Sequence, residues 1–172
     1  MTLTDLLDVS RWEALERNIT TRLGLNPGVF HADGRKVTGY SNWVNPLCPA
    51  VRAVPNGLSQ ICSCANQVIS RKAERDGPVV EECDAGLCKI AVPIFAPGRN
   101  GSRGEFLGVA GGCGARIADS ALGLFHVGRV TGLAPDRLEE LAASVPTITP
   151  AMARHAALQI ADWVERMLPA QA

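Results

Sequence analysis

The sequence predicts an α+β fold in which an antiparallel sheet is flanked by N- and C-terminal helices. One observation is the order of the expected elements, which is helix, hairpin, helix, three strands and then helices. Another is the Asp33-Gly34 turn signal near the N-terminus, which is typical of a hairpin that opens an antiparallel sheet. This order is best satisfied by a sheet with helices packed against one face.

Residues 3–24 are predicted to form an amphipathic helix. Its apolar residues recur at spacings of three to five, with Ser10 as a possible cap for a restart near Arg11. Gly24 and Pro27 end the helix. The apolar stripe consists of Leu3, Leu6, Leu7, Trp12, Leu15, Ile19 and Leu23.

The hairpin is expected over residues 28–40, where β-prone runs flank the Asp33-Gly34 turn. Residues 41–57 then contain three prolines and an Asn-Gly pair, and we expect a loop there. Cys48 lies between two of the prolines. Because binding residues concentrate on loops held by a rigid scaffold, Cys48 is a candidate ligand.

A second helix is predicted over residues 58–75 and is ended by Asp76-Gly77-Pro78. Cys62 and Cys64 lie in its first turns. Residues two apart on a regular helix point about 200° away from each other. Both thiols can therefore bind one centre only if the helix starts after Cys64 or is distorted there.

Three strands are expected next, over residues 79–84, 89–95 and 106–114. Pro93 predicts that the second of them has an edge or a bulge at that point. Gly111 and Gly112 in the third leave room for close approach of a ligand or of another backbone.

The sequence after Cys113 is predicted to be helical over residues 118–130, 135–143 and 149–168. Pro150 lies in the first turn of the last of these helices, where proline is favoured.

The length indicates one domain over residues 1–172, with a cysteine-bearing core at 28–114 and C-terminal helices at 118–168. Seventeen basic residues balance seventeen acidic ones, which argues against direct binding of nucleic acid. The N-terminus lacks the pattern of a signal peptide, and no apolar run reaches the roughly 18 residues of a membrane span. We therefore expect a cytoplasmic protein.

All six cysteines lie in the central segment that begins at Cys48 and ends at Cys113. Thiolate is a strong ligand for zinc, copper(I) and iron–sulfur clusters. Disulfides and independent buried thiols are the alternatives. Confinement of every thiol to one segment favours a shared metal or cluster, and the expected metal ligands are Cys48, Cys62, Cys64 and Cys83.

An iron–sulfur cluster is the expected cofactor, with zinc as the alternative. Ribbon and finger zinc sites have two to four residues between paired cysteines. This chain instead has a CxC and a Cx4C pair and no CxxC pair. Cys88 or Cys113 replaces one thiol of the CxC pair if the helix is regular through Cys64. Such a centre would report redox, gas or ligand state.

Several short stretches together match one family pattern. They are Asp33-Gly34, Asn56-Gly57, Asp76–Val79, Cys83–Leu87, Val92–Ile94, Leu107-Gly108, Gly111-Gly112, Thr131–Leu141 and Val145-Pro146. With these stretches the sequence resembles the PocR sensory domain, a variant of the PAS-like fold. The resemblance implies a ligand-sensing role, with small hydrocarbon derivatives such as diols as ligands. Three cysteines of the family pattern correspond to Cys48, Cys62 and Cys83. Cys64, Cys88 and Cys113 are additional, and Cys113 stands where the family tends to have a polar residue such as Gln.

Two alternatives to a metal sensor remain open. One is a metal-free module that binds a small molecule and whose pocket is lined by Tyr40, Trp43, Cys88 and Cys113. The other is an enzyme with a thiol nucleophile, for which the candidate bases are His31, His126 and His155. No DNA-binding or kinase segment follows, so we expect any signal to pass through a protein partner or a homodimer.

Overall fold

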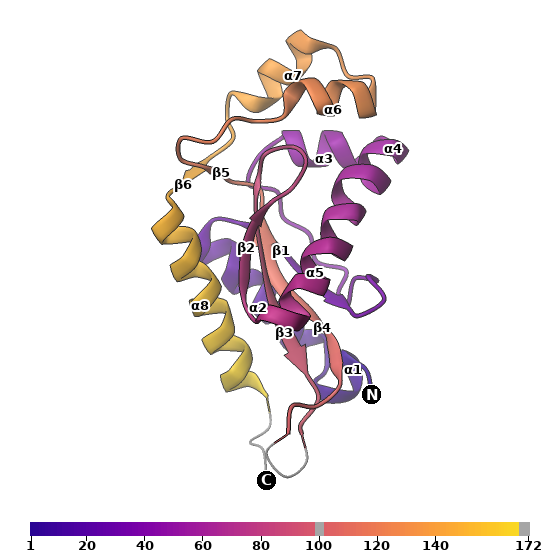
Figure 1. The fold of residues 1–172 in the computed structure, drawn as a ribbon, viewed down its shortest axis with the longest axis vertical. Coiled ribbons are helices and arrows are strands. Elements are labelled where there is room, and N and C mark those ends of the chain that lie inside the picture. Colours follow the sequence, from indigo (N-terminus) through magenta and orange to yellow (C-terminus); the bar gives the residue numbers. More distant parts are fainter. Residues whose placement is uncertain (99–101, 169–172) are drawn as a thin grey trace.

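A four-stranded antiparallel sheet in the order β1-β4-β3-β2 lies at the centre of the computed structural model (Figure 1). The structure describes residues 1–98 and 102–168, so 99–101 and 169–172 of the predicted domain lie outside it. The expected α+β class, with an antiparallel sheet and flanking terminal helices, is confirmed. The strands are β1 (Asn26–His31), β2 (Val79–Glu82), β3 (Cys88–Phe95) and β4 (Phe106–Cys113).

The predicted N-terminal helix is divided into α1 (Leu3–Leu6) and α2 (Val9–Leu23). The chain is extended at Leu7 between them, and the Trp12 indole N–H donates to the Leu3 carbonyl at 3.0 Å, which ties α1 to α2. Gly24 ends α2 in the left-handed conformation, as its position in the sequence predicts.

The predicted hairpin is only partly formed. The chain turns at Asp33-Gly34, but a single bridge between Phe30 and Lys36 is all the pairing that follows. Strand β1 pairs instead with β4, with Asn26 opposite Cys113. The second strand of the hairpin is therefore short, and β1 joins the sheet by pairing with β4, a strand far away in the sequence.

Helix replaces most of the loop that was expected over residues 41–57. This segment contains α3 (Leu47–Arg52) and α4 (Pro55–Gly57). The π-helix η1 (Leu58–Ser63) and α5 (Cys64–Asp76) follow it. The expectation of a loop was wrong because prolines also suit a helix start: Pro46 and Pro49 lie at the cap and in the first turn of α3, where no N–H is needed. Cys48 thus lies on a helix.

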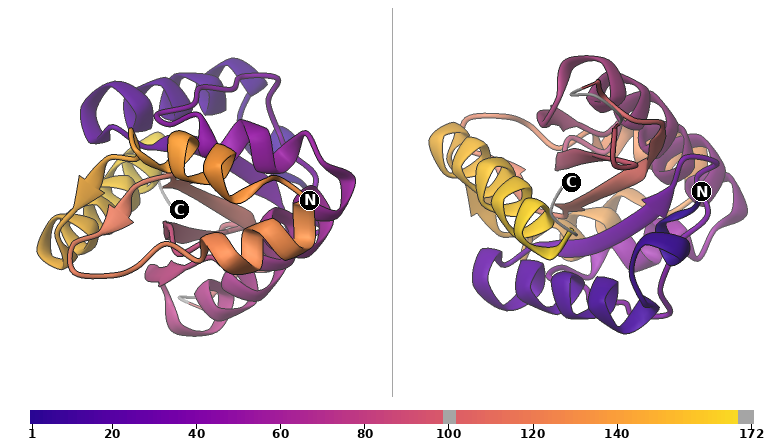
Figure 2. Two further views of the ribbon diagram at one scale, coloured as in Figure 1. Left: turned by 90° about the horizontal axis from the view of Figure 1, so that it is seen from above. Right: turned by 90° about the horizontal axis from the view of Figure 1, so that it is seen from below.

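Helices cover both faces of the sheet, so the expectation that they pack against one face was wrong (Figures 1 and 2). Helices α2 and α8 (Pro150–Met167) pack on one face, and α5 packs on the other. The physical reason is that β3 and β4 are buried along most of their length rather than alternately. A strand that is apolar on both sides must be covered on both sides.

Pro93 lies where β3 has lost its neighbour on one side. Strand β2 pairs with β3 only as far as Ala91, and the pairing with β4 becomes irregular at Ile94 and Phe95. The prediction of an edge or a bulge at Pro93 is confirmed.

The C-terminal part begins with a short parallel pair, β5 (Arg116–Ile117) with β6 (Thr147–Ile148), which was not predicted. Between them, α6 (Leu124–Thr131) and α7 (Pro135–Ala142) pack with α3 in a second core beyond the end of the sheet (Figure 1). Within the described residues, no helix is long and apolar enough to cross a membrane.

Candidate functional site

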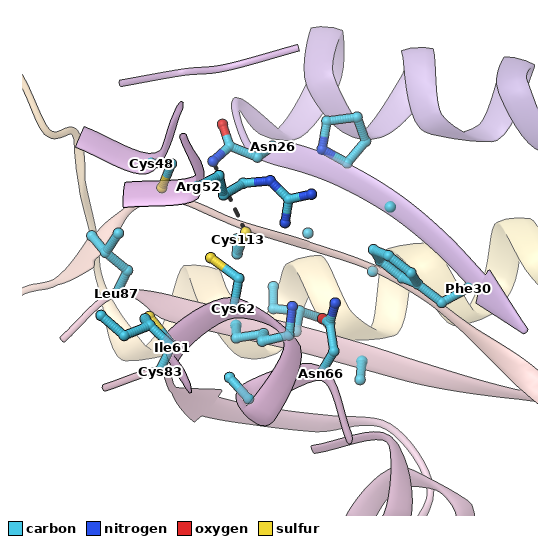
Figure 3. Close-up of a pocket in the computed structure, with 18 of the residues that line it drawn as sticks. Asn26, Phe30, Cys48, Arg52, Ile61, Cys62, Asn66, Cys83, Leu87 and Cys113 are labelled. Carbon is cyan, nitrogen blue, oxygen red and sulfur yellow. Dashed lines mark hydrogen bonds between the residues drawn. The ribbon is translucent and has the colours of Figure 1, made fainter. Parts of the chain in front are cut away.

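A cavity of about 100 Å³ lies between the sheet and the helices α3, η1 and α5 (Figure 3). A cavity needs roughly 10–15 Å³ to hold one water molecule, so this one has room for several waters or for a small organic molecule. We call it the thiol cavity, because Cys48, Cys62, Cys83 and Cys113 all line it.

The sheet leaves this space open because it presents small residues there. Gly28 of β1 pairs with Gly111 of β4, next to Ala91 of β3. A Cβ atom on Gly111 would lie 1.9 Å from the Ile90 carbonyl oxygen, so no side chain fits. The Phe30 ring occupies the position of a Gly28 side chain. The glycine pair therefore makes a flat floor bordered by an aromatic ring.

Cys62 lies at the cavity in a distorted stretch of helix, and Cys64 lies away from the cavity. The π-helix η1 contains Cys62, and the regular α5 begins at Cys64. Single π turns within helices are frequent at functional sites. Cys62 lines the cavity, whereas Cys64 is exposed and does not. The structure thus shows the distortion considered from the sequence, but it does not bring the two thiols together.

Two buried asparagines hold donor groups against cavity thiols. The Asn45 amide nitrogen is 3.4 Å from the Cys48 sulfur, and its oxygen accepts from the Cys48 backbone N–H at 2.8 Å. The Asn26 amide nitrogen is 3.9 Å from the Cys113 sulfur, and its oxygen accepts from the Val44 N–H. The Asn45 amide nitrogen also donates to the Gly114 carbonyl at 2.6 Å. The bonds to the two amide oxygens orient both side chains, and each amide nitrogen lies near a cavity sulfur.

Burial raises the pKa of three of the four cavity thiols. It raises the pKa of Cys48 to about 12; Cys113 adds to the rise, and the Asn45 amide opposes it. Burial also raises the pKa of Cys62, against the opposing charge of the Arg52 guanidinium. It raises that of Cys83 as well, against hydrogen bonds from backbone N–H groups. Without a bound cation, Cys48, Cys62 and Cys83 are therefore neutral thiols at neutral pH.

The charged side chains at the cavity are all cationic. Arg52, Lys89 and Lys36 line it, and none of the described lining residues is acidic. Lys36 is 3.6 Å from the Glu16 carboxylate, but Arg52 and Lys89 form no ion pair among the described residues. They lie instead over aromatic rings, 5.5 Å from the Trp43 centroid and 6.0 Å from the Phe30 centroid respectively.

The remaining predicted site residues lie elsewhere, except Trp43, which lines the cavity. Cys88 is buried in the core on the opposite face of the sheet, where burial raises its pKa to about 12. Tyr40 does not line the cavity, and its ring instead faces Arg17 at 4.4 Å. No lining residue among those described is a histidine, so none of the three proposed bases lines it.

Sequence reasoning missed Asn26, Asn45 and Arg52. Single polar residues of this kind carry no motif, and the two asparagines act through contacts that the topology creates. Arg52 had a usable signal: it lies four residues after Cys48, which places both on one face of a helix. That signal depended on predicting α3.

Among the described residues, no group of three or more His, Cys, Asp or Glu side chains is placed to hold a metal ion. The four cavity thiols come from separate elements and do not form a closed single-ion site.

The family described as the sensory domain found in PocR matches residues 5–167 of the 172. The match spans every helix and strand of the sheet layers except the first residues of α1. No curated protein and no solved structure matches the chain.

Proposed function

Because the chain belongs to the family of the sensory domain found in PocR, we propose that it senses a small molecule bound in the thiol cavity. The observation that carries this proposal is the cavity itself, with its flat glycine floor, its buried thiols and two cations that have no carboxylate partner among the described residues. Pockets with apolar walls and a few placed polar groups are typical binding sites. The bound state would be passed to a protein partner or to a second copy of the chain.

The charges of the cavity favour a ligand with an anionic end and a short apolar body. Arg52 and Lys89 face a space with no acidic lining residue among those described. An unpaired cation near apolar surface is stabilised by an anion, and Arg presents several donors to a carboxylate. The apolar body would lie over the Gly28–Gly111 floor beside Phe30.

Lactate and propane-1,2-diol test this choice, because they share a carbon skeleton and differ in a carboxylate against a hydroxymethyl group. We expect lactate to raise the Tm of the protein more than the diol does. A ligand at a hundredfold excess over Kd stabilises by about 2.7 kcal/mol. For a chain of this size that raises Tm by roughly 5–10 °C. Arg52→Gln weakens lactate binding by about tenfold or more, because it removes a charge-assisted hydrogen bond.

Two variants of α5 provide the control. Ala65 lines the cavity, so Ala65→Leu fills it and abolishes the shift by either compound. Val68 is 61 % exposed on the same helix and lies outside the cavity, so Val68→Leu leaves the shift unchanged. A wild-type protein that binds neither compound, or an Ala65→Leu protein that binds both normally, contradicts the proposal.

A second candidate function is redox or gas sensing through an iron–sulfur cluster or zinc. One observation favours it: four of the six thiols line the same cavity, although they come from separate parts of the chain. This function predicts coloured protein after purification without oxygen. Colourless protein with stoichiometric zinc would favour zinc instead.

A further inference from the structure

We propose that Cys48, Cys62, Cys83 and Cys113 together hold one iron–sulfur cluster in the thiol cavity. The inference rests on the second proposed function and specifies its ligand set. It replaces the exposed Cys64 of the sequence prediction with Cys113, which the sheet brings to the cavity from β4. Four separate elements supply the thiols: α3, η1, the turn after β2, and the end of β4.

The strongest evidence is that buried amides donate to two of the cavity thiols. Cys48 and Cys113 accept from the amides of Asn45 and Asn26, at 3.4 and 3.9 Å. Figure 3 shows the Asn26 amide and the Cys113 sulfur facing each other. At the other two thiols, the Arg52 guanidinium lowers the pKa of Cys62, and backbone N–H groups of its own turn lower the pKa of Cys83, each against the effect of burial.

Donors of this kind suit thiolates better than thiols. A neutral thiol is a weak hydrogen-bond acceptor, so a hydrogen bond from a buried amide to a neutral thiol adds little stability. A metal-bound thiolate carries negative charge, and hydrogen bonds to the sulfurs are a principal means by which proteins tune iron–sulfur clusters. Asn45 and Asn26 are only 4 % and 3 % exposed, so both amides are built into the interior.

The two thiols outside the cavity provide an internal comparison. Cys88 is fully buried, so burial alone does not bring a thiol to the cavity. Cys64 is exposed and lies outside the cavity, although it is adjacent in sequence to η1. Position at the cavity therefore distinguishes Cys48, Cys62, Cys83 and Cys113 from the other two thiols.

Charge and spacing favour a cluster over a single ion. Thiolates around one zinc ion each lie about 2.3 Å from it, which crowds the sulfurs together. The described residues contain no such group. In a cluster the cysteines bind different iron atoms, so their sulfurs lie farther apart. A cluster with four thiolates is anionic, and two of the three cations that line the cavity, Arg52 and Lys89, have no acidic partner among the described residues.

The cluster leaves part of the cavity free. Cys113 of β4 lies opposite Asn26 of β1, and Phe30 lies four residues farther along β1. Four residues of a strand span roughly 13 Å. The thiols therefore lie toward one end, and Phe30 borders the other (Figure 3). A small molecule at the Phe30 end would bind next to the cluster.

The experiment is anaerobic purification followed by reconstitution with iron salts, sulfide and dithiothreitol, applied to the full chain. We expect iron and acid-labile sulfide in equal amounts, together with visible absorbance. Separate replacement of Cys48, Cys62, Cys83 or Cys113 by Ser removes most of both. Cys64→Ser and Cys88→Ala keep them, with circular dichroism as the check on folding.

A second readout remains informative if a cysteine variant fails to fold. Arg52→Gln keeps the cluster but lowers its reduction potential, because it removes a positive charge and a hydrogen bond near sulfur. Arg71→Gln is the matched control, because Arg71 is an exposed residue of α5 outside the cavity. Equal potentials in the two variants contradict the proposal.

Wild-type protein that stays free of iron after reconstitution also overturns the cluster. So does a cluster that survives in Cys48→Ser and Cys113→Ser but is lost in Cys64→Ser. Lactate binding by iron-free protein would then show that small-molecule sensing holds without the cluster. If the protein holds a cluster but binds neither lactate nor the diol, the cluster assignment holds and small-molecule sensing in the cavity does not.

Discussion

The two faces of the central sheet are built from the same strands but are filled differently. On the face covered by α2 and α8, the strand residues Ile90 and Ile94 meet Trp12 and Ile160, all at most 2 % exposed. On the other face, neighbouring positions of the same strands carry glycine, alanine, lysine and cysteine around a cavity. Because alternate residues of a strand point to opposite faces, one strand contributes both to the packed core and to the binding surface.

Shortening one valine on each face tests this comparison and has the largest expected effect. Val92 is buried in the packed core, and Val109 borders the thiol cavity. Val92→Ala leaves a closed void, so we expect a loss of about 2–3 kcal/mol in the free energy of unfolding. In Val109→Ala the new void opens into the thiol cavity. The expected loss in the free energy of unfolding is therefore about 1 kcal/mol smaller than for Val92→Ala.

Denaturant titration of both variants measures the difference, because the two substitutions delete the same atoms. Equal losses would mean that the thiol cavity is closed by packing in solution. A larger loss for Val109→Ala would reverse the assignment of the packed face.

The carboxylate of Glu16 extends the comparison to charge. It is fully buried and accepts from the Val29 N–H at 3.0 Å and from the Thr38 hydroxyl, with Lys36 at 3.6 Å. Burial raises its pKa, and the Thr38 hydrogen bond and Lys36 oppose the rise. The Glu16 carboxylate is therefore an ion-pair partner of Lys36. Arg52 and Lys89, the other two cavity cations, have no such partner among the described residues.

Glu16→Gln should change how stability depends on pH. A carboxyl whose folded pKa is raised stabilises the fold below its unfolded pKa, roughly 4.3, and this contribution is lost as pH rises through the folded pKa. The Gln variant has no such loss. We expect the variant to gain stability relative to wild type as the pH rises above about 4.3 through the folded pKa of Glu16.

Unfolding titrations of both proteins at several pH values measure this difference. A stability difference that stays constant with pH, or one that falls, contradicts a raised pKa. A large loss at every pH would instead indicate that the ion pair with Lys36 outweighs desolvation.

Sequence reasoning reached the sheet and half of the site for a physical reason. Local patterns predicted the strands, and the density of thiols indicated a shared centre. Two outcomes depended on structure that no local pattern encodes: the π turn in which Cys62 lies, and the long-range pairing of Asn26 with Cys113. Helix α3 was not predicted because its prolines were interpreted as loop signals. Without that helix, the position of Arg52 on the same face as Cys48 could not be predicted either.

The smallest expected effects distinguish exposed from enclosed thiols. In metal-free protein at neutral pH, a small alkylating reagent should modify the exposed Cys64 first. Cys48 and Cys88 should react last, because they are enclosed and burial raises the pKa of each to about 12, which leaves little thiolate. Cys64→Ser should change the free energy of unfolding by less than about 0.5 kcal/mol, as expected for a surface substitution. Mass spectrometry of timed samples gives the order, and Cys48 reacting as fast as Cys64 would mean that the thiol cavity opens to solvent on its own.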